Sequence, residues 1–165
     1  MTLDYPNYEL KDSFTEYIVA SLSYTSPIDV NSASNQLIKA LNTYDLDHFC
    51  TVLTSLFANI PYLLHIHKES YYHSLFHFLM NFLILEIRSE QLTNKGRIDT
   101  VIMIGEYIYI FELKINNNPN EPLQQIISKK YYEAYIMYNK PMILVGLSFM
   151  ISEQDFSVAY VAEKT

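Results

Sequence analysis

The sequence predicts an α/β domain in which a central mixed sheet is flanked by helices. From about residue 68 onward, the apolar residues follow helical and strand-like periods in the order helix, strand, strand, strand, helix, strand, strand. Three strands in succession favour an antiparallel meander, and the crossover helix should place the next strand parallel to a neighbour. Apolar residues on both faces of the central hairpin indicate that both sides of the sheet are covered.

Three short amphipathic helices are expected before this core. The first spans about residues 9–22, and the third is capped by Asp45 and ends before Pro61. None of the three carries a convergent cluster of polar side chains. We therefore expect residues 1–67 to form a helical annex that packs on a core of residues 68–165.

The core elements follow from the same periodicity. A helix is expected over about residues 68–83, followed by a β-like run over 84–92. The central hairpin then turns at Gly105-Glu106, and a two-residue connection with Gly first suits a type II′ turn. The later elements are a helix over about residues 121–138 and strands over 142–150 and 156–161.

The hairpin brings charged residues together. If Ile104 and Tyr107 flank the turn, opposed residues have numbers that sum to 211, so Asp99 and Glu112 lie directly across from one another. Lys114 is two residues beyond Glu112 and therefore shares that face of the sheet. A three-residue loop would break this register. Such charges on an otherwise apolar hairpin are costly without partners, and a divalent cation is the obvious partner.

Composition limits the classes of function. The net charge of −7 argues against a general electrostatic nucleic-acid binder. It does not exclude a metal-dependent nuclease, because bound cations offset acidic residues. Cys50 is the single cysteine, so no intramolecular disulfide forms, and a buried thiol is expected. No signal peptide and no membrane-spanning run are recognisable, so we expect a cytoplasmic protein without a membrane partner.

The ordered motifs resemble the PD-(D/E)XK nuclease superfamily, whose α-β-β-β-α-β core carries an Asp and then Glu-x-Lys on the next strand. Here these are Asp99 and Glu112-Leu113-Lys114, with Ile98 where the superfamily's named Pro stands. The sequence is more closely similar to the nuclease domain found C-terminal to AAA-ATPase-like domains in bacterial proteins. The likeness covers about residues 5–163, and its matching words are Pro6–Leu10, Ile60–Tyr62, Glu69–His73, Thr93–Asp99, Tyr107–Lys114, Gln125-Ile126, Lys130-Tyr131, Gly146 and Phe149.

The resemblance implies a restriction-endonuclease-like core and a nuclease that hydrolyses phosphodiester bonds with a Mg²⁺-activated water, Mn²⁺ being an alternative cation. Asp99 and Glu112 would hold the metal, with the backbone carbonyl of Leu113 as a further ligand. Lys114 would orient the attacking water and offset charge at the phosphate. Gln125 would position the water or the substrate backbone. Nucleic acid, with DNA expected, is the implied partner, together with an AAA-ATPase-like domain.

Several of these residues keep a second interpretation. Asp99, Glu112 and Lys114 could form a structural ion-pair network at the end of the sheet. Glu69 could be a catalytic residue and metal ligand, or could only favour the N-terminus of its helix. Gln125 could be a solvated residue. The histidines are expected to be structural, although His73 could support Glu69 from one helical turn away.

Two further residues are weaker site candidates, and one alternative function remains. Arg97 and Lys129 are weak candidates for nucleic-acid contacts. The alternative function is a catalytically silent module on the same fold that binds nucleic acid or another protein. Degenerate members of the superfamily should lack the Asp, the Glu or the Lys. All three are present here, which favours the enzyme.

Overall fold

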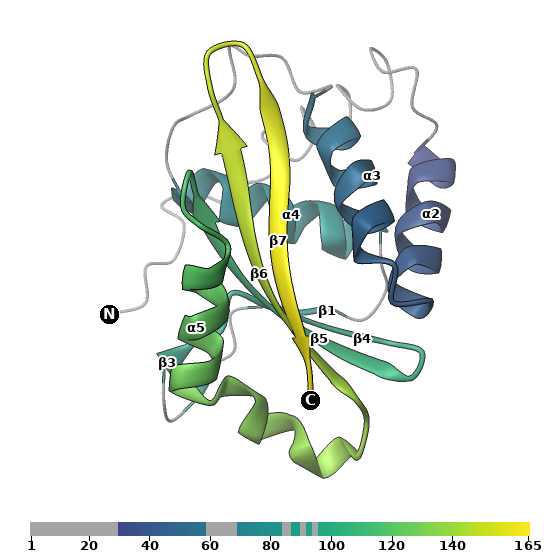
Figure 1. Ribbon diagram of the computed structural model, residues 1–165. Coiled ribbons are helices and arrows are strands. Elements are labelled where there is room, and N and C mark those ends of the chain that lie inside the picture. Colours follow the sequence, from purple (N-terminus) through teal and green to yellow (C-terminus); the bar gives the residue numbers. More distant parts are fainter. Residues whose placement is uncertain (1–29, 59–68, 84–86, 90–91, 94–95) are drawn as a thin grey trace, which may run out of the picture.

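The computed structural model describes residues 30–58, 69–83, 87–89, 92–93 and 96–165 (Figure 1). The expected first helix over residues 9–22 lies outside the described residues. The described elements form a mixed α/β fold with helices on both sides of a sheet, as the sequence predicts. No described helix is long and apolar enough to cross a membrane.

The sheet has five strands in the order β1-β4-β5-β6-β7. The meander of β1 (Ile87–Ser89), β4 (Thr100–Ile104) and β5 (Tyr107–Ile115) is antiparallel throughout. Strand β6 (Met142–Ile151) is parallel to β5, and β7 (Phe156–Lys164) is antiparallel to β6. The crossover connection therefore produces the parallel pair that was expected.

A separate two-stranded ribbon lies between β1 and β4 in the sequence. It pairs β2 (Leu92–Thr93) with β3 (Gly96–Arg97). A Cβ atom at Gly96 would lie 2.9 Å from the hydroxyl oxygen of Tyr131. The ribbon therefore packs against the segment that follows the crossover helix.

The central hairpin has the predicted register. Ile104 pairs with Tyr107 and Thr100 with Phe111, which places Asp99 and Glu112 at the next opposed position. Gly105 has a φ of 54°, and Glu106 is not among the residues with positive φ. Positive φ at the first turn residue alone is the type II′ pattern that glycine permits.

The two faces of the sheet build two hydrophobic cores. Tyr109, Phe111 and Leu113 point into one core, whereas Ile108 and Ile110 point into the other. The first core is covered by α2 (Val30–Asn42), α3 (Leu46–Ala58) and α4 (Glu69–Leu83). The second is covered by α5 (Asn120–Lys129) and the 3₁₀-helix η2 (Tyr131–Tyr138). Alternation along β5 thus supplies both layers.

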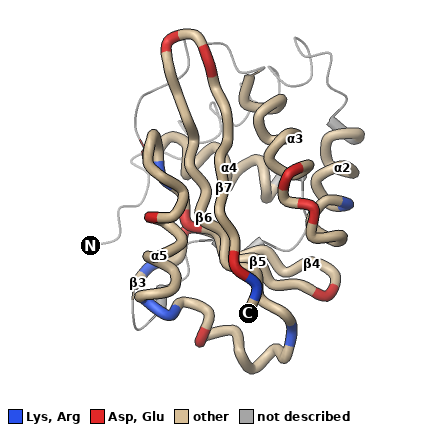
Figure 2. Tube along the Cα trace, in the orientation of Figure 1, with Lys and Arg blue, Asp and Glu red and all other residues tan. Residues whose placement is uncertain are grey.

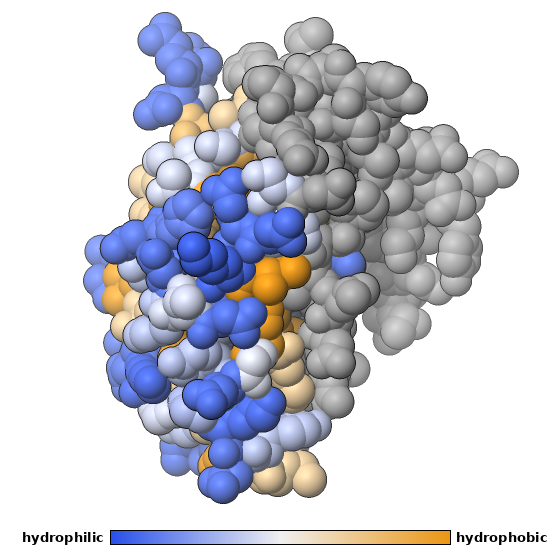
Figure 3. Space-filling view, turned by 90° about the vertical axis from the view of Figure 1, so that its right-hand side faces the viewer, coloured by the Kyte–Doolittle hydropathy of each residue, from blue (hydrophilic) through white to orange (hydrophobic). Residues whose placement is uncertain are grey.

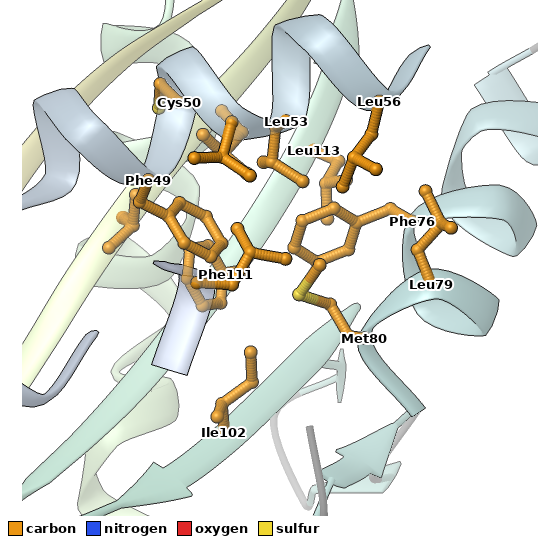
Figure 4. Close-up of a cluster of buried hydrophobic side chains, with 14 of the residues drawn as sticks. Phe49, Cys50, Leu53, Leu56, Phe76, Leu79, Met80, Ile102, Phe111 and Leu113 are labelled. Carbon is orange, nitrogen blue, oxygen red and sulfur yellow. The ribbon is translucent and has the colours of Figure 1, made fainter. Parts of the chain in front are cut away.

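Aromatic rings tie the N-terminal helices to the sheet. Phe111 of β5 lies between Phe49 of α3 and Phe76 of α4, with ring centroids 5.7 and 5.5 Å from its own (Figure 4). Each fully buried ring of this kind stabilises the fold by about 1.5–3 kcal/mol. The backbone N–H of His48 donates to Asp45 Oδ1 at 3.0 Å, which is the expected cap of α3. Helices α2 and α3 therefore share one core with the sheet.

The prediction of one continuous helix over residues 121–138 is wrong. Helix α5 ends at Lys129, Lys130 takes the left-handed conformation with a φ of 50°, and a 3₁₀-helix follows. A left-handed residue ends an α-helix because its backbone cannot continue the i to i−4 pattern. Ala134 and Tyr138, which lie in this 3₁₀ segment, are exposed.

The distribution of charged and polar residues depends on their place in the fold. Charged residues gather at the ends of elements and in the loops, and most of the length of the strands carries none (Figure 2). Among the described residues on the side that shows α2 and α3, most are hydrophilic, and a small apolar area lies among them (Figure 3). A charged side chain inside the sheet is therefore an exception that requires a physical explanation.

Candidate active site

The charged side chains that lie inside the sheet gather at one end of β5. Glu112 and Lys114 lie in this strand, and Asp99 immediately precedes β4. Glu69 is the first residue of α4, and Gln125 lies in α5. The structure thus brings together five of the predicted site residues, from β5, α4, α5 and the position before β4.

Asp99 is fixed by the hairpin itself. Its Oδ2 accepts a hydrogen bond from the backbone N–H of Leu113 at 2.9 Å. Its side chain is only 13% exposed. Burial raises the pKa of Asp99, while His73, the Leu113 amide and Lys114 act in the opposite direction. The carboxylate is therefore held in place, but the neighbouring groups offset only part of the effect of burial on its pKa.

Glu112 is the most deeply buried charged group of the site. Its Oε1 accepts a short hydrogen bond from Gln125 Nε2. Its Oε2 is buried and has no hydrogen-bond partner among the described residues. A buried carboxylate oxygen in this position requires either a proton or a cation. Glu112 is therefore the strongest single indication of a ligand site.

The electrostatics of Glu112 agree with this geometry. Burial first, and then the charge of Asp99, raise the pKa of Glu112 to about 8, although Lys114 and the backbone N–H of Asp99 lower it. Two carboxylates that share a poorly solvated site cannot both ionise easily. The metal-free site therefore retains a proton near neutral pH, and a cation would release it.

Gly146 sets the distance between α5 and Glu112. It pairs with Glu112 across β5 and β6. A Cβ atom at Gly146 would lie 2.6 Å from the backbone nitrogen of Leu123 and would also collide with the carbonyl oxygen of Pro119. Only glycine permits this close approach of the helix to the strand. The same approach puts Gln125 within reach of Glu112.

Lys114 is paired with α4. Its Nζ donates a hydrogen bond to Glu69 Oε1 at 3.0 Å. Burial lowers the pKa of Lys114, but the hydrogen bond and the charge of Glu69 outweigh it, so that the net direction is upward. From the sequence, Glu69 is expected to be a metal ligand or a residue that only favours the helix N-terminus. The contact that the structure adds is with the lysine.

His73 is a member of the site that the sequence analysis left as structural. Its Nε2 lies 2.9 Å from the carbonyl oxygen of Leu113, and its Nδ1 lies 3.4 Å from Asp99 Oδ1. Because a carbonyl oxygen only accepts, Nε2 is the nitrogen that carries a hydrogen in this contact. The available signal was the spacing of four residues from Glu69, which puts both side chains on one face of α4.

The two weaker candidates lie outside these contacts. Arg97 of β3 and Lys129 at the end of α5 are both exposed. The ribbon that carries Arg97 packs on Tyr131, two residues beyond Lys129. The structure therefore places them near one another on the surface without placing either among the buried carboxylates.

The donor set fits a hard divalent cation. Asp99 and Glu112 offer carboxylate oxygens, and Leu113 offers a carbonyl oxygen, and Mg²⁺ and Mn²⁺ both bind such ligands. The unpartnered Oε2 of Glu112 is the structural evidence for this fit. Within the described part of the chain, no group of three or more His, Cys, Asp or Glu side chains forms a metal site by itself. The set is thus two carboxylates and a main-chain oxygen.

Comparison with known proteins supports the fold. A family model described as the PD-(D/E)XK nuclease superfamily matches residues 67–156, which is more than half of the chain. An uncharacterized protein encoded in the vnfD 5′ region of Azotobacter chroococcum mcd 1 is 32% identical over 169 residues, covering 98% of this chain and 32% of that protein. The chain therefore spans about a third of the length of this relative.

One solved structure shows a remote likeness. It is titled "Crystal structure of SSO0001", and the match has 14% sequence identity and a TM-score of 0.32, covering 93% of this chain and 78% of that one. Such a likeness is too remote to bear on the assignment. The family match rests instead on the segment that holds β1 to β6 and every residue of the candidate site. The chain belongs to the PD-(D/E)XK nuclease superfamily.

Proposed function

We propose that the protein is a divalent-metal-dependent nuclease that hydrolyses phosphodiester bonds in nucleic acid, with DNA as the expected substrate. The observation that carries the proposal is the buried Oε2 of Glu112, which finds no hydrogen-bond partner among the described residues and lies beside Asp99 and Lys114. A structural ion-pair network would leave this oxygen paired with a donor. Membership of a nuclease superfamily supports the reaction class.

Asp99, Glu112 and the Leu113 carbonyl would hold Mg²⁺ or Mn²⁺. When bound, the cation supplies Lewis-acid stabilisation of the phosphate and lowers the pKa of a bound water. Gln125 keeps Glu112 oriented through Oε1, so that Oε2 remains available. His73 Nε2 holds the carbonyl oxygen of Leu113, and the backbone N–H of Leu113 holds Asp99 Oδ2.

Lys114 supplies the positive charge beside these oxygens. Its ammonium would orient the attacking water and offset negative charge that develops on the phosphate. In the reaction the oxygen of water bonds to phosphorus while the bond from phosphorus to the leaving oxygen breaks, and a proton passes to that oxygen. Lys114 therefore has to be close to the carboxylates without neutralising them.

Contacts with the substrate backbone are proposed for Arg97 and Lys129. Both are exposed, and the ribbon of Arg97 packs on the segment that follows Lys129. The chain has a net charge of −7, so attraction to phosphates has to come from local basic groups and the cation. We also propose a cytoplasmic setting and an association with an AAA-ATPase-like domain, which rests on the resemblance of the motif words.

The decisive experiment compares cleavage of double-stranded DNA, single-stranded DNA and RNA in Mg²⁺, Mn²⁺ and EDTA. The parent should cleave only with metal, and Asp99→Asn and Lys114→Ala should each lose about 100-fold or more of the rate. Glu106→Gln, in the exposed hairpin turn, is the matched control and should cleave like the parent. Cleavage at the parental rate by both site variants would refute the assignment.

The alternative functions predict different outcomes when the same protein is assayed for DNA binding and cleavage. Retention on DNA without cleavage in any metal would indicate a silent nucleic-acid-binding module. Absence of both cleavage and retention would indicate a protein-interaction module. Either outcome, obtained with a parent protein that is folded, replaces the nuclease proposal.

A further inference from the structure

We infer that Glu69 is the positioning residue of Lys114: its carboxylate holds the lysine ammonium on the α4 side of the site, away from Asp99 and Glu112. The inference rests on the proposed function. It concerns how the lysine is kept apart from the two carboxylates, and it assigns Glu69 to the lysine rather than to the metal.

The contact between the two residues is direct and joins distant parts of the chain. Lys114 Nζ lies 3.0 Å from Glu69 Oε1, and the two residues are separated by 45 positions in the sequence. The lysine side chain is 26% exposed, so its ammonium is not freely hydrated. A charge-assisted hydrogen bond in such surroundings is stronger than one between neutral groups. Glu69 therefore determines where the end of this flexible side chain lies.

The position of Glu69 differs from that of the two buried carboxylates. Its side chain is 42% exposed, compared with 13% for Asp99. Its Oε1 lies 3.0 Å from Lys114 Nζ and 3.7 Å from His73 Nε2. Among the described side chains, Glu69 does not combine with Asp99 and Glu112 into a three-carboxylate metal site. Glu69 is thus more exposed than Asp99, and its contacts are with Lys114 and His73.

The consequence appears if Glu69 is removed. A lysine has a long stem with many accessible rotamers, and its ammonium turns toward whichever negative charge is near. Asp99 and Glu112 both act electrostatically on Lys114, although neither forms an ion pair with it in the described structure. A released ammonium would pair with these carboxylates and compete with the cation. Glu69 therefore keeps the oxygens available and the ammonium beside the phosphate position.

The test is a double-mutant cycle on cation affinity, a quantity that does not depend on cleavage. Free Mn²⁺ is measured by electron paramagnetic resonance during titration of the parent, Glu69→Ala, Lys114→Ala and the double variant. We expect Glu69→Ala to weaken Mn²⁺ binding by about 5-fold to 10-fold in the parent and by less than about 2-fold when Lys114 is absent. An equal loss in both backgrounds would make Glu69 a metal ligand and overturn the inference.

A matched control separates the effect of the Glu69–Lys114 contact from the effect of a carboxylate at a helix N-terminus. Glu121 is an exposed residue in the first turn of α5 and bonds to Asn117, outside the site. Glu121→Ala should therefore leave the Mn²⁺ affinity unchanged while removing a comparable interaction with a helix dipole. Glu69→Gln, which keeps the shape and an acceptor oxygen, provides a second variant if Glu69→Ala does not fold.

The cleavage rates complete the test. At saturating Mg²⁺, Glu69→Ala should lower kcat by about 10-fold with little change in KM, and should cause no further loss once Lys114 is removed. Glu69→Gln should recover part of this loss. If the parent binds Mn²⁺ and cleaves, but Glu69→Ala matches it in both affinity and kcat, this inference alone fails. If the parent binds no Mn²⁺, the proposed function fails as well.

Discussion

Gln125 donates a hydrogen bond to one carboxylate oxygen of Glu112, and the other oxygen of Glu112 is buried without a partner among the described residues. This division gives the two oxygens different roles. The first anchors the side chain to α5, and the second is free to receive a cation.

Replacing Gln125 with Leu should weaken Mn²⁺ binding by about 10-fold, because Glu112 loses the donor that orients it and stabilises its charged form. Calorimetric titration with Mn²⁺ measures the effect. Gln124→Leu, at the exposed neighbouring position, is the control and should bind like the parent. Equal affinity of the Gln125 variant and the parent would show that the amide plays no part in the site.

Stability should depend on pH in a direction set by Glu112. Its pKa is raised from 4.5 to about 8 in the folded state, so the folded protein binds this proton more tightly than the unfolded chain. The stabilisation is complete below the unfolded pKa and is lost as pH rises through about 8. Without metal, we expect a loss on the order of a few kcal/mol between pH 5 and pH 9.

Glu112→Gln isolates this contribution, because glutamine resembles the protonated acid. Urea unfolding in EDTA should show the variant to be more stable than the parent at pH 9, with a smaller difference at pH 5. A parent and variant that lose stability in parallel with rising pH would exclude the raised pKa of Glu112 as the cause.

Added metal should offset the loss of stability that the two neighbouring carboxylates cause. Mn²⁺ at about 100 times its Kd should stabilise the folded parent by about 2.7 kcal/mol, seen as a higher Tm. The double variant Asp99→Asn with Glu112→Gln lacks both negative charges and should show no shift. A Na⁺ titration at the same ionic strength separates specific binding from screening. A shift of the same size in the double variant would place the cation elsewhere.

Gly146→Ala should disturb the site through the backbone. The added methyl group would collide with the Pro119 carbonyl and the Leu123 amide, so α5 has to move away from β6. We expect a loss of about 1–3 kcal/mol in unfolding free energy, together with weaker Mn²⁺ binding because Gln125 moves with the helix. Urea unfolding and calorimetry measure the two effects.

The control for this substitution is Ser157→Ala, at an exposed position of β7. It adds no bulk, and it should change neither stability nor metal affinity. If Gly146→Ala also leaves both quantities unchanged, the close approach of α5 to β6 does not position the site.

The hairpin shows how far the sequence alone can lead. The alternation of β4 and β5 and the two-residue turn at Gly105 determine that Asp99, Glu112 and Lys114 share one face. These are local properties, because they depend on the two-residue period of a strand and on the φ that glycine permits. The same local reasoning failed at Lys130, where a left-handed residue divides an apolar pattern that reads as one helix.

The partners of Glu69 and His73 were decided by tertiary structure. Their spacing in the sequence predicts that they share one face of α4, but it does not say which strand that face meets. The packing of Phe76 against Phe111 places α4 beside the end of β5, where Glu69 meets Lys114 and His73 meets the Leu113 carbonyl.

The sequence by itself therefore determined the carboxylate pair, its register and the family, since these depend on residues within one hairpin and on the order of motifs. Only the tertiary structure decided that one oxygen of Glu112 has no partner in the described part of the chain and that Glu69 holds Lys114. Both depend on contacts between elements far apart in the chain. Such contacts are set by how the helices pack on the sheet, which local periodicity does not specify.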